Sequence, residues 1–154
     1  MRRTTQPIEP VRKQRQVPIP PERAFELFTA GMGRWWPLST HSIAAADATG
    51  VRFEGRVGGQ IVELTADGTE HLWAVVTTWD PPHRLVLSWH PTIEPEAAST
   101  VEVRFLPVEG GTRVELEHRD FEELGEVGPV ARENYDPGWE PVLDRLLTRA
   151  EAST

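Results

Sequence analysis

The sequence has no cysteine, which removes a whole set of chemistries. Without thiols the chain has no disulfide, no thiolate nucleophile, and no Cys-based zinc or iron–sulfur site. Basic residues are also scarce: Lys13 is the single lysine, and 16 Lys and Arg face 24 Asp and Glu, for a formal net charge of −8. Nucleic acids and anionic membrane surfaces are bound by clustered positive charge. The composition therefore predicts neither a nucleic-acid partner nor a membrane partner.

Long apolar runs are missing as well. No stretch approaches the ~20 apolar residues that cross a bilayer. Residues 1–7 are not followed by the apolar region of a signal peptide. We therefore expect a cytoplasmic protein. Its 154 residues fit one domain, which we predict over residues 10–151 behind a flexible N-terminal tail at 1–9.

The common motifs of catalysis and metal binding do not occur. Gly58-Gly59 precedes a predicted strand, whereas a phosphate loop follows a strand and opens a helix. No histidine pair has zincin spacing, so we predict no metal and no cofactor. Ser39, Ser42 and Ser88 lack an evident base together with an orienting acid at the level of the sequence, although a triad assembled in space stays open. The sequence therefore favours a non-enzymatic function over an enzymatic one.

The segment best suited to form β-strands is centred on residues 70–90. Trp73, Trp79 and Trp89 lie in two arms that are rich in β-branched and aromatic residues. Asp80-Pro81-Pro82 separates the arms, and proline presets φ and removes a ladder donor. The pattern predicts two strands joined by a tight turn.

Further short strands flank this hairpin. The two that follow it alternate cleanly, with Val101, Val103 and Phe105 on one face of the first. The first strand of the chain is expected at a sheet edge, because Pro18 and Pro20 end it. Outside the hairpin, strands are predicted at residues 11–19, 51–54, 60–65, 100–106 and 112–119, with loops at 44–50 and 90–99.

Two helical regions complete the pattern. Residues 20–29 begin with prolines and carry one apolar face, which predicts a helix. Residues 127–135 are weakly helical, Asp136-Pro137-Gly138 is expected to interrupt them, and residues 139–150 have an apolar face beginning at Trp139. That face needs a partner, for which the concave side of the sheet is suited. The sequence therefore predicts an α+β domain with helices on one face of a curved antiparallel sheet.

These elements, in this order, resemble the helix-grip fold of the START-like, or SRPBCC, superfamily, and within it the branch named after the activator of Hsp90 ATPase (AHSA1-like). The resemblance extends from about Val11 to Ala150. The matching segments are Pro21–Phe25, Trp35-Trp36, Gly58-Gly59, Val76–Leu85, Leu87-Ser88-Trp89, Gly111–Val114 and Gly138-Trp139.

The resemblance implies a Bet v 1-like architecture, in which the sheet wraps around a long C-terminal helix and a cavity between them takes apolar ligands. Some relatives are hydrolases or cyclases, and many are simple carriers. The Hsp90 activator itself engages the chaperone. We therefore expect a binding protein for a small hydrophobic or amphipathic molecule. The two competing hypotheses are an Hsp90-type chaperone-interacting module, and a cyclase or hydrolase of the superfamily.

The residues predicted to line the cavity are Trp35, Trp36, Trp89, His118 and Trp139. A plain core role is the simpler interpretation of any one of them, because aromatics dominate cores. Adjacent residues cannot both face one core from a helix, so one of Trp35 and Trp36 is expected at the mouth. His118 shares a strand face with Val114 and Leu116, as a structural histidine or alternatively as a pocket anchor or general base.

The titratable residues of the predicted strands leave catalysis open. Catalysis would need two titratable side chains that point inward. The candidates are His118 together with either His71 or Glu63. The inward face of the strand that carries His71 is ambiguous, which leaves a bulge in this strand open. Glu63, Glu115 and Glu117 are otherwise expected to pair with arginines on a solvated sheet face. An exposed edge strand or the 90–99 loop would also allow a homodimer.

Overall fold

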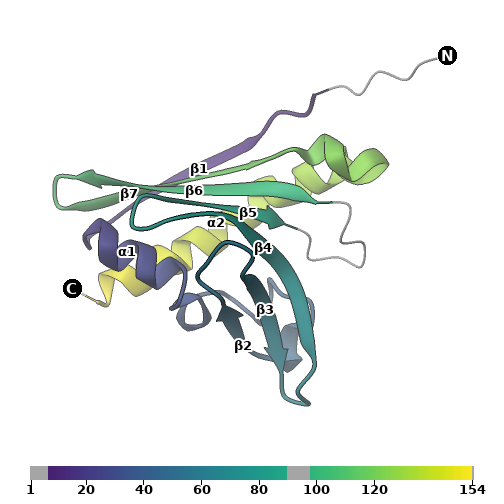
Figure 1. Ribbon diagram of the computed structural model, residues 1–154, viewed down its shortest axis with the longest axis horizontal. Coiled ribbons are helices and arrows are strands. Elements are labelled where there is room, and N and C mark those ends of the chain that lie inside the picture. The colour runs from purple at the N-terminus through teal and green to yellow at the C-terminus, as the bar shows by residue number, and fades with distance from the viewer. Residues whose placement is uncertain (1–6, 90–97, 154) are drawn as a thin grey trace.

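The computed structural model describes residues 7–89 and 98–153 (Figure 1). His90 and most of the predicted 90–99 loop lie outside the described residues. The strands are β1 (Val11–Val17), β2 (Ala48–Phe53), β3 (Gln60–Thr65), β4 (Glu70–Asp80), β5 (Arg84–Trp89), β6 (Ser99–Val108) and β7 (Gly111–Arg119). The α-helices are α1 (Pro21–Phe28) and α2 (Gly128–Glu151), and short 3₁₀ helices are η1 (Met32–Arg34), η2 (Ala45–Asp47) and η3 (Phe121–Val127).

All described strands form one antiparallel sheet in the order β1-β7-β6-β5-β4-β3-β2. The sheet curls, and α2 runs along one of its faces (Figure 1). This arrangement confirms the predicted α+β helix-grip fold. It also confirms the hairpin over residues 70–90, as β4 and β5, and the edge position of the first strand, β1.

The core lies between the inner sheet face and the helices. Val101, Val103 and Phe105 of β6 are buried, as their alternation predicts. On α2 the buried residues Trp139, Val142, Leu143, Leu146 and Ala150 follow the helical period. Each fully buried large apolar side chain stabilises the fold by about 1.5–3 kcal/mol, so this contact is the main source of stability for the long helix.

A β-bulge in β4 settles the ambiguity of that strand. Ile61 pairs with Ala74 and Val62 pairs with Leu72, so Trp73 is an extra residue in β4. An extra residue shifts the alternation by one. Trp73 and Ala74 are therefore both buried although they are neighbours in sequence.

The predicted interruption of the C-terminal helix is wrong. The helix α2 is continuous from Gly128 to Glu151 and contains Pro137 and Pro141. An interior proline costs an isolated helix about 3 kcal/mol. Here both prolines are exposed, and the helix is held from the opposite side by its buried aromatic and apolar residues.

Ion pairs to the edge strand also hold α2 in place. Lys13 Nζ lies 2.8 Å from Asp136 and 2.7 Å from Glu140, and Arg15 pairs with Glu140 and Asp144. Hydrogen bonds to Asp136 and Glu140 raise the pKa of Lys13. These contacts join the edge strand β1 to three successive turns of the helix.

The structure adds detail to two further segments, the predicted loop at residues 44–50 and the predicted N-terminal tail at residues 1–9. The predicted loop at 44–50 contains η2, and β2 begins at Ala48, because the free edge of β3 offers its ladder groups to this segment. Of the predicted tail, residues 1–6 are not described. Ile8 N donates to Glu122 at 2.9 Å, and Arg132 Nε donates to the carbonyl of Glu9.

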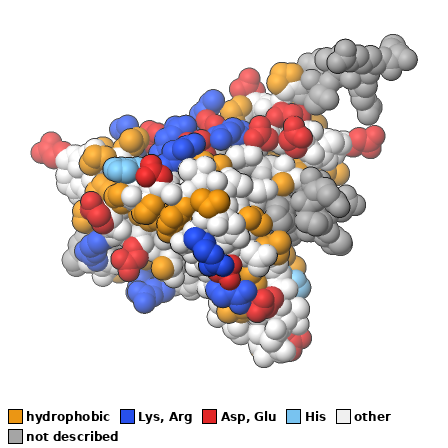
Figure 2. Space-filling model, in the orientation of Figure 1, with side chains coloured by type: hydrophobic (Ala, Val, Ile, Leu, Met, Phe, Trp, Pro, Cys, Tyr) orange, Lys and Arg blue, Asp and Glu red, His pale blue; other side chains and the backbone are white. Residues whose placement is uncertain are grey.

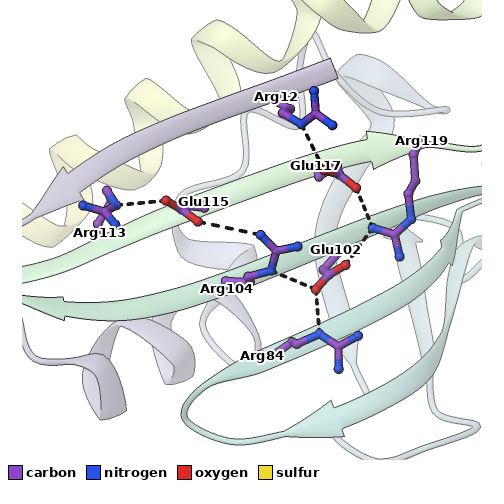
Figure 3. A network of polar contacts seen from close by, with 8 residues as sticks. All are labelled: Arg12, Arg84, Glu102, Arg104, Arg113, Glu115, Glu117 and Arg119. Carbon is purple, nitrogen blue, oxygen red and sulfur yellow. Dashed lines mark hydrogen bonds and ion pairs between the residues drawn. The ribbon is translucent and has the colours of Figure 1, made fainter. Parts of the chain in front are cut away.

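The outer sheet face carries a network of arginines and glutamates (Figure 3). Its centre is Glu102, which accepts hydrogen bonds from Arg84 at 2.6 Å, Arg119 at 2.7 Å and Arg104 at 3.0 Å. Burial alone would raise the pKa of Glu102, but these three arginines lower it to about 2. Figure 2 shows basic and acidic side chains gathered over this face. Pairing of the sheet-face glutamates with arginines is thereby confirmed for Glu115 and Glu117.

Candidate functional site

A pocket of about 390 Å³ lies between the sheet, α2 and the segment that precedes β2. Ligand pockets in proteins typically span roughly 300–1,000 Å³. The lining residues are Trp36, residues 40–43, Trp73, Trp89, Asn134, Tyr135, Gly138, Trp139 and Val142. The wall therefore combines three parts of the chain that are far apart in sequence.

Four tryptophans form the wall of this pocket. Trp36 lies at their centre, with its ring centroid 4.9 Å from that of Trp73, 6.1 Å from Trp89 and 5.8 Å from Trp139. Such distances are typical of favourable aromatic pairs. Three of these residues, Trp36, Trp89 and Trp139, were predicted from the sequence to line a cavity. Trp73 was not singled out for this role, because the local pattern left the inward face of its strand ambiguous.

Each of the four indole N–H groups is used by the protein itself. Trp36 Nε1 donates to the carbonyl of His41 at 2.6 Å, and Trp89 Nε1 donates to Tyr135 Oη at 3.0 Å. The other two N–H groups donate to the side chains of Glu63 and His118. The tryptophans therefore offer the pocket aromatic surface and no free donor.

The two adjacent tryptophans are placed differently from the expectation. Neither is at an exposed mouth: Trp35 is 2% exposed and Trp36 is 7% exposed. Trp35 is not among the residues that line the pocket; its ring centroid lies 5.4 Å from that of Phe28, and its Nε1 donates to the carbonyl of Leu27. Trp35 follows η1 with φ −130°, so the two residues do not sit on a helix and their rings can enter different parts of the core.

His118 lies behind the pocket wall. It is fully buried, its Nδ1 accepts from Trp139 Nε1 at 3.0 Å, and its Nε2 lies 2.7 Å from Ser99 Oγ. Because an indole only donates, Nδ1 must be unprotonated, and Nε2 carries the hydrogen that points to Ser99. Burial lowers the pKa of His118 to about 3.

This tautomer bears on the general-base role predicted for His118. With its hydrogen on Nε2, the ring cannot accept a proton from Ser99, so the pair lacks the protonation state of a nucleophile and its base. The predicted pairing with Glu63 or His71 is not formed either: His118 hydrogen-bonds to Ser99 and Trp139, and in the sheet the strands β6 and β5 separate β7 from β4 and β3. The geometry is that of a satisfied structural histidine.

Glu63 is buried beside two lining residues, Ile43 and Trp73, rather than on a solvated sheet face. Its side chain is buried, with Oε1 accepting from Ile43 N at 2.7 Å and Trp73 Nε1 at 2.9 Å, and Oε2 accepting from Ala44 N at 2.6 Å. The prediction that Glu63 pairs with an arginine is therefore wrong. The carboxylate instead ties the 40–43 wall to the sheet, because that segment has backbone donors without a strand partner.

Two polar side chains of the lining have the chemistry of ligand anchors. Burial raises the pKa of Tyr135, so its hydroxyl stays neutral, accepts from Trp89 and retains its own hydrogen for donation. His41 Nδ1 lies 2.8 Å from Thr40 Oγ1. Sequence reasoning missed both residues, because one lies in an irregular segment and the other in a weak helical pattern.

The described residues offer no other obvious chemistry. Ser42 Oγ donates to the carbonyl of Leu38 and accepts from Ala45 N, as in a turn. Within residues 7–89 and 98–153, no group of three or more His, Asp or Glu side chains is arranged to hold a metal ion. Over the same residues, no helix has the length and apolar character needed to cross a membrane.

Several solved structures share this fold. An anthrahydroquino-γ-pyrone synthase, Txn09, complexed with SUM, is 34% identical, with 92% of this chain and 97% of that chain covered and a TM-score of 0.65. The solution structure of an AHSA1-like protein from Aeromonas hydrophila is 19% identical, with 94% of each chain covered and a TM-score of 0.66. A protein from Rhodobacter sphaeroides is 23% identical, with 93% and 92% covered and a TM-score of 0.65.

Sequence comparisons place the chain in one family. The search of curated proteins found no match. The model of the family described as "Activator of Hsp90 ATPase homolog 1-like protein" matches residues 18–151, which is most of the chain. This match shows that the chain belongs to the activator of Hsp90 ATPase homolog 1-like family.

Proposed function

We propose that the chain binds a flat, largely apolar aromatic molecule in the tryptophan-lined pocket. The observation that carries the proposal is the wall itself: four indole rings present aromatic surface while their N–H groups are used elsewhere. Apolar area removed from water contributes about 25 cal/mol per Å² to binding. Tyr135 and His41 would orient a ligand that carries hydroxyl or carbonyl groups.

The synthase at 34% identity supports the chemical class of the ligand. Its description names an anthrahydroquinone, which is a fused tricyclic aromatic system with oxygen substituents. A molecule of this kind offers faces for ring stacking and oxygen atoms for a hydroxyl or imidazole. We therefore expect a polycyclic phenol or quinone to bind in preference to a fatty acid of similar apolar area.

Gly138 provides a sharp test, because it lines the pocket from the middle of α2. A Cβ added there would meet no atom within 4 Å. Gly138→Ala is therefore expected to stabilise the helix by about 0.5–1 kcal/mol. Gly138→Phe is expected to place a ring in the pocket and to lower the affinity for an aromatic ligand at least tenfold, without loss of fold.

The measurement uses 1,8-dihydroxyanthraquinone and palmitate as probes. Native mass spectrometry and a thermal-shift titration report binding, since a ligand at 100 times its dissociation constant stabilises the native state by about 2.7 kcal/mol. The quinone should raise the melting temperature of the wild type and of Gly138→Ala, but not of Gly138→Phe. Equal shifts in all three proteins would contradict binding in this pocket.

The same relative favours a second candidate function, ring closure on a bound aromatic substrate. His41 and Tyr135 are the side chains of the pocket that can move protons, and general acid–base catalysis contributes about 10²–10⁴-fold. With the substrate of the related synthase, we expect the wild type to turn over. The turnover rate should fall about 10²–10⁴-fold in His41→Gln and in Tyr135→Phe, while both variants still bind the quinone probe. If the wild type binds the substrate without turnover, ring closure is excluded and the carrier function is the one supported.

Interaction with an Hsp90-type chaperone stays a prediction, tested by stimulation of the chaperone ATPase.

A further inference from the structure

A second concave site lies beside α1. It is a groove of about 530 Å³ between α1, the residues after β2 and the β4–β5 turn, and it shares no lining residue with the tryptophan-lined pocket. Figure 2 shows hydrophobic side chains around the β4–β5 turn, with acidic side chains close to them over α1. The groove therefore combines apolar surface with negative charge.

The floor of the groove is aromatic. The half-buried Trp79 packs edge-on against Phe25, with ring centroids 4.9 Å apart, and lies 6.2 Å from Phe53. Gly55 makes this placement possible, since a Cβ at that position would lie 2.8 Å from Trp79 Cζ2. The indole therefore presents part of its surface to solvent from a fixed position.

The rim of the groove is acidic. Glu22 and Glu26 are one turn apart on α1, both are exposed, and both line the groove. Neither carboxylate has an ion pair or a side-chain hydrogen bond among the described residues, whereas most arginines on the sheet are paired. Of the residues that the structure describes, none that lines this groove is basic.

We propose that this groove binds a small organic cation with an apolar body, such as an aromatic quaternary ammonium. The charged group would lie over the Trp79 ring, where the ring quadrupole attracts a cation. Glu22 and Glu26 would add charge complementarity, and the apolar body would cover Phe53 and Pro82. Anions of the same size are repelled by the same rim.

The probe is benzyltrimethylammonium, compared with phenylacetate and benzyl alcohol, and the readout is the Nε1–H resonance of each tryptophan in the ¹H–¹⁵N spectrum. The cation should shift the Trp79 resonance and leave those of the pocket tryptophans unchanged, and higher ionic strength should weaken the effect. Phenylacetate should cause no shift. A cation that shifts only the pocket tryptophans, or phenylacetate that binds as well as the cation, would overturn the proposal.

Variants locate the interaction. The double change Glu22→Gln and Glu26→Gln, on the surface of α1, is expected to weaken cation binding about threefold to tenfold. The matched control Glu123→Gln, an exposed glutamate of η3, should leave it unchanged. Trp79→Leu should weaken it about fivefold or more. Unaltered affinity in the double variant would exclude a role for the acidic rim even if Trp79→Leu failed to fold.

Discussion

Glu63→Gln is expected to lower the free energy of unfolding by about 2–4 kcal/mol. One buried carboxylate accepts three hydrogen bonds, from the backbone of Ile43 and Ala44 and from the indole of Trp73. An amide keeps one acceptor oxygen and turns an N–H₂ group toward an N–H donor. Each buried donor left without a partner costs about 1–3 kcal/mol. Urea unfolding followed by tryptophan fluorescence measures the loss.

The change should also act on the pocket, because residues 40–43 form part of its wall. Amide hydrogen exchange of Ile43 and Ala44 should become faster in Glu63→Gln, and the affinity for the quinone probe should fall. Two controls are needed: Glu109→Gln for the loss of a charge at an exposed turn, and Val114→Ala for a loss of stability on a distant strand. A cost below about 0.5 kcal/mol, or exchange unchanged at both amides, would contradict the role assigned to Glu63.

Acidification from pH 7 to pH 5 is expected to cost the protein about 2 kcal/mol through His118 alone. Its pKa is about 3 in the native state and 6.5 in the unfolded chain. Between these values the unfolded state binds a proton that the native state does not, so stability falls as pH falls below 6.5. The cost is about 1.36 kcal/mol for each pH unit below 6.5.

The surroundings of His118 offer the imidazolium no compensation. Its described contacts are Ser99, Phe121, Tyr135 and the indoles of Trp89 and Trp139. Tyr135 is the titratable member of this set, and burial keeps it neutral. The carboxylate of Glu102, with a pKa of about 2, contributes to acid sensitivity only at lower pH.

The variant that isolates this effect is His118→Gln. A glutamine can accept from Trp139 and donate to Ser99, so the fold should be retained with a lower stability at pH 7 and a flatter profile between pH 7 and pH 5. The control is His83→Gln, at an exposed turn, which should keep the wild-type slope. The assignment to His118 fails if the His118→Gln variant loses as much stability on acidification as the wild type does.

The sequence by itself determined the architecture. Alternation along β6 and β7, the Pro-rich turn after β4, and the apolar stripe beginning at Trp139 are local patterns that follow from the geometry of strands and helices. The order of these patterns was enough for the helix-grip resemblance. Whether residues such as Val103 and Leu143 are buried could therefore be predicted without coordinates.

Only the tertiary structure decided the composition of the site. The bulge in β4 places Trp73 on the inner face of the sheet, and the irregular backbone after η1 places Trp35 outside the pocket lining. Packing keeps α2 helical through Pro137. Glu63 became a buried acceptor because a segment 20 residues earlier brought its unpaired N–H groups to it. Strand and helix periods specify which face of an element is apolar, whereas the direction of a ring near a bulge and the partner of a buried carboxylate depend on groups far away in the sequence.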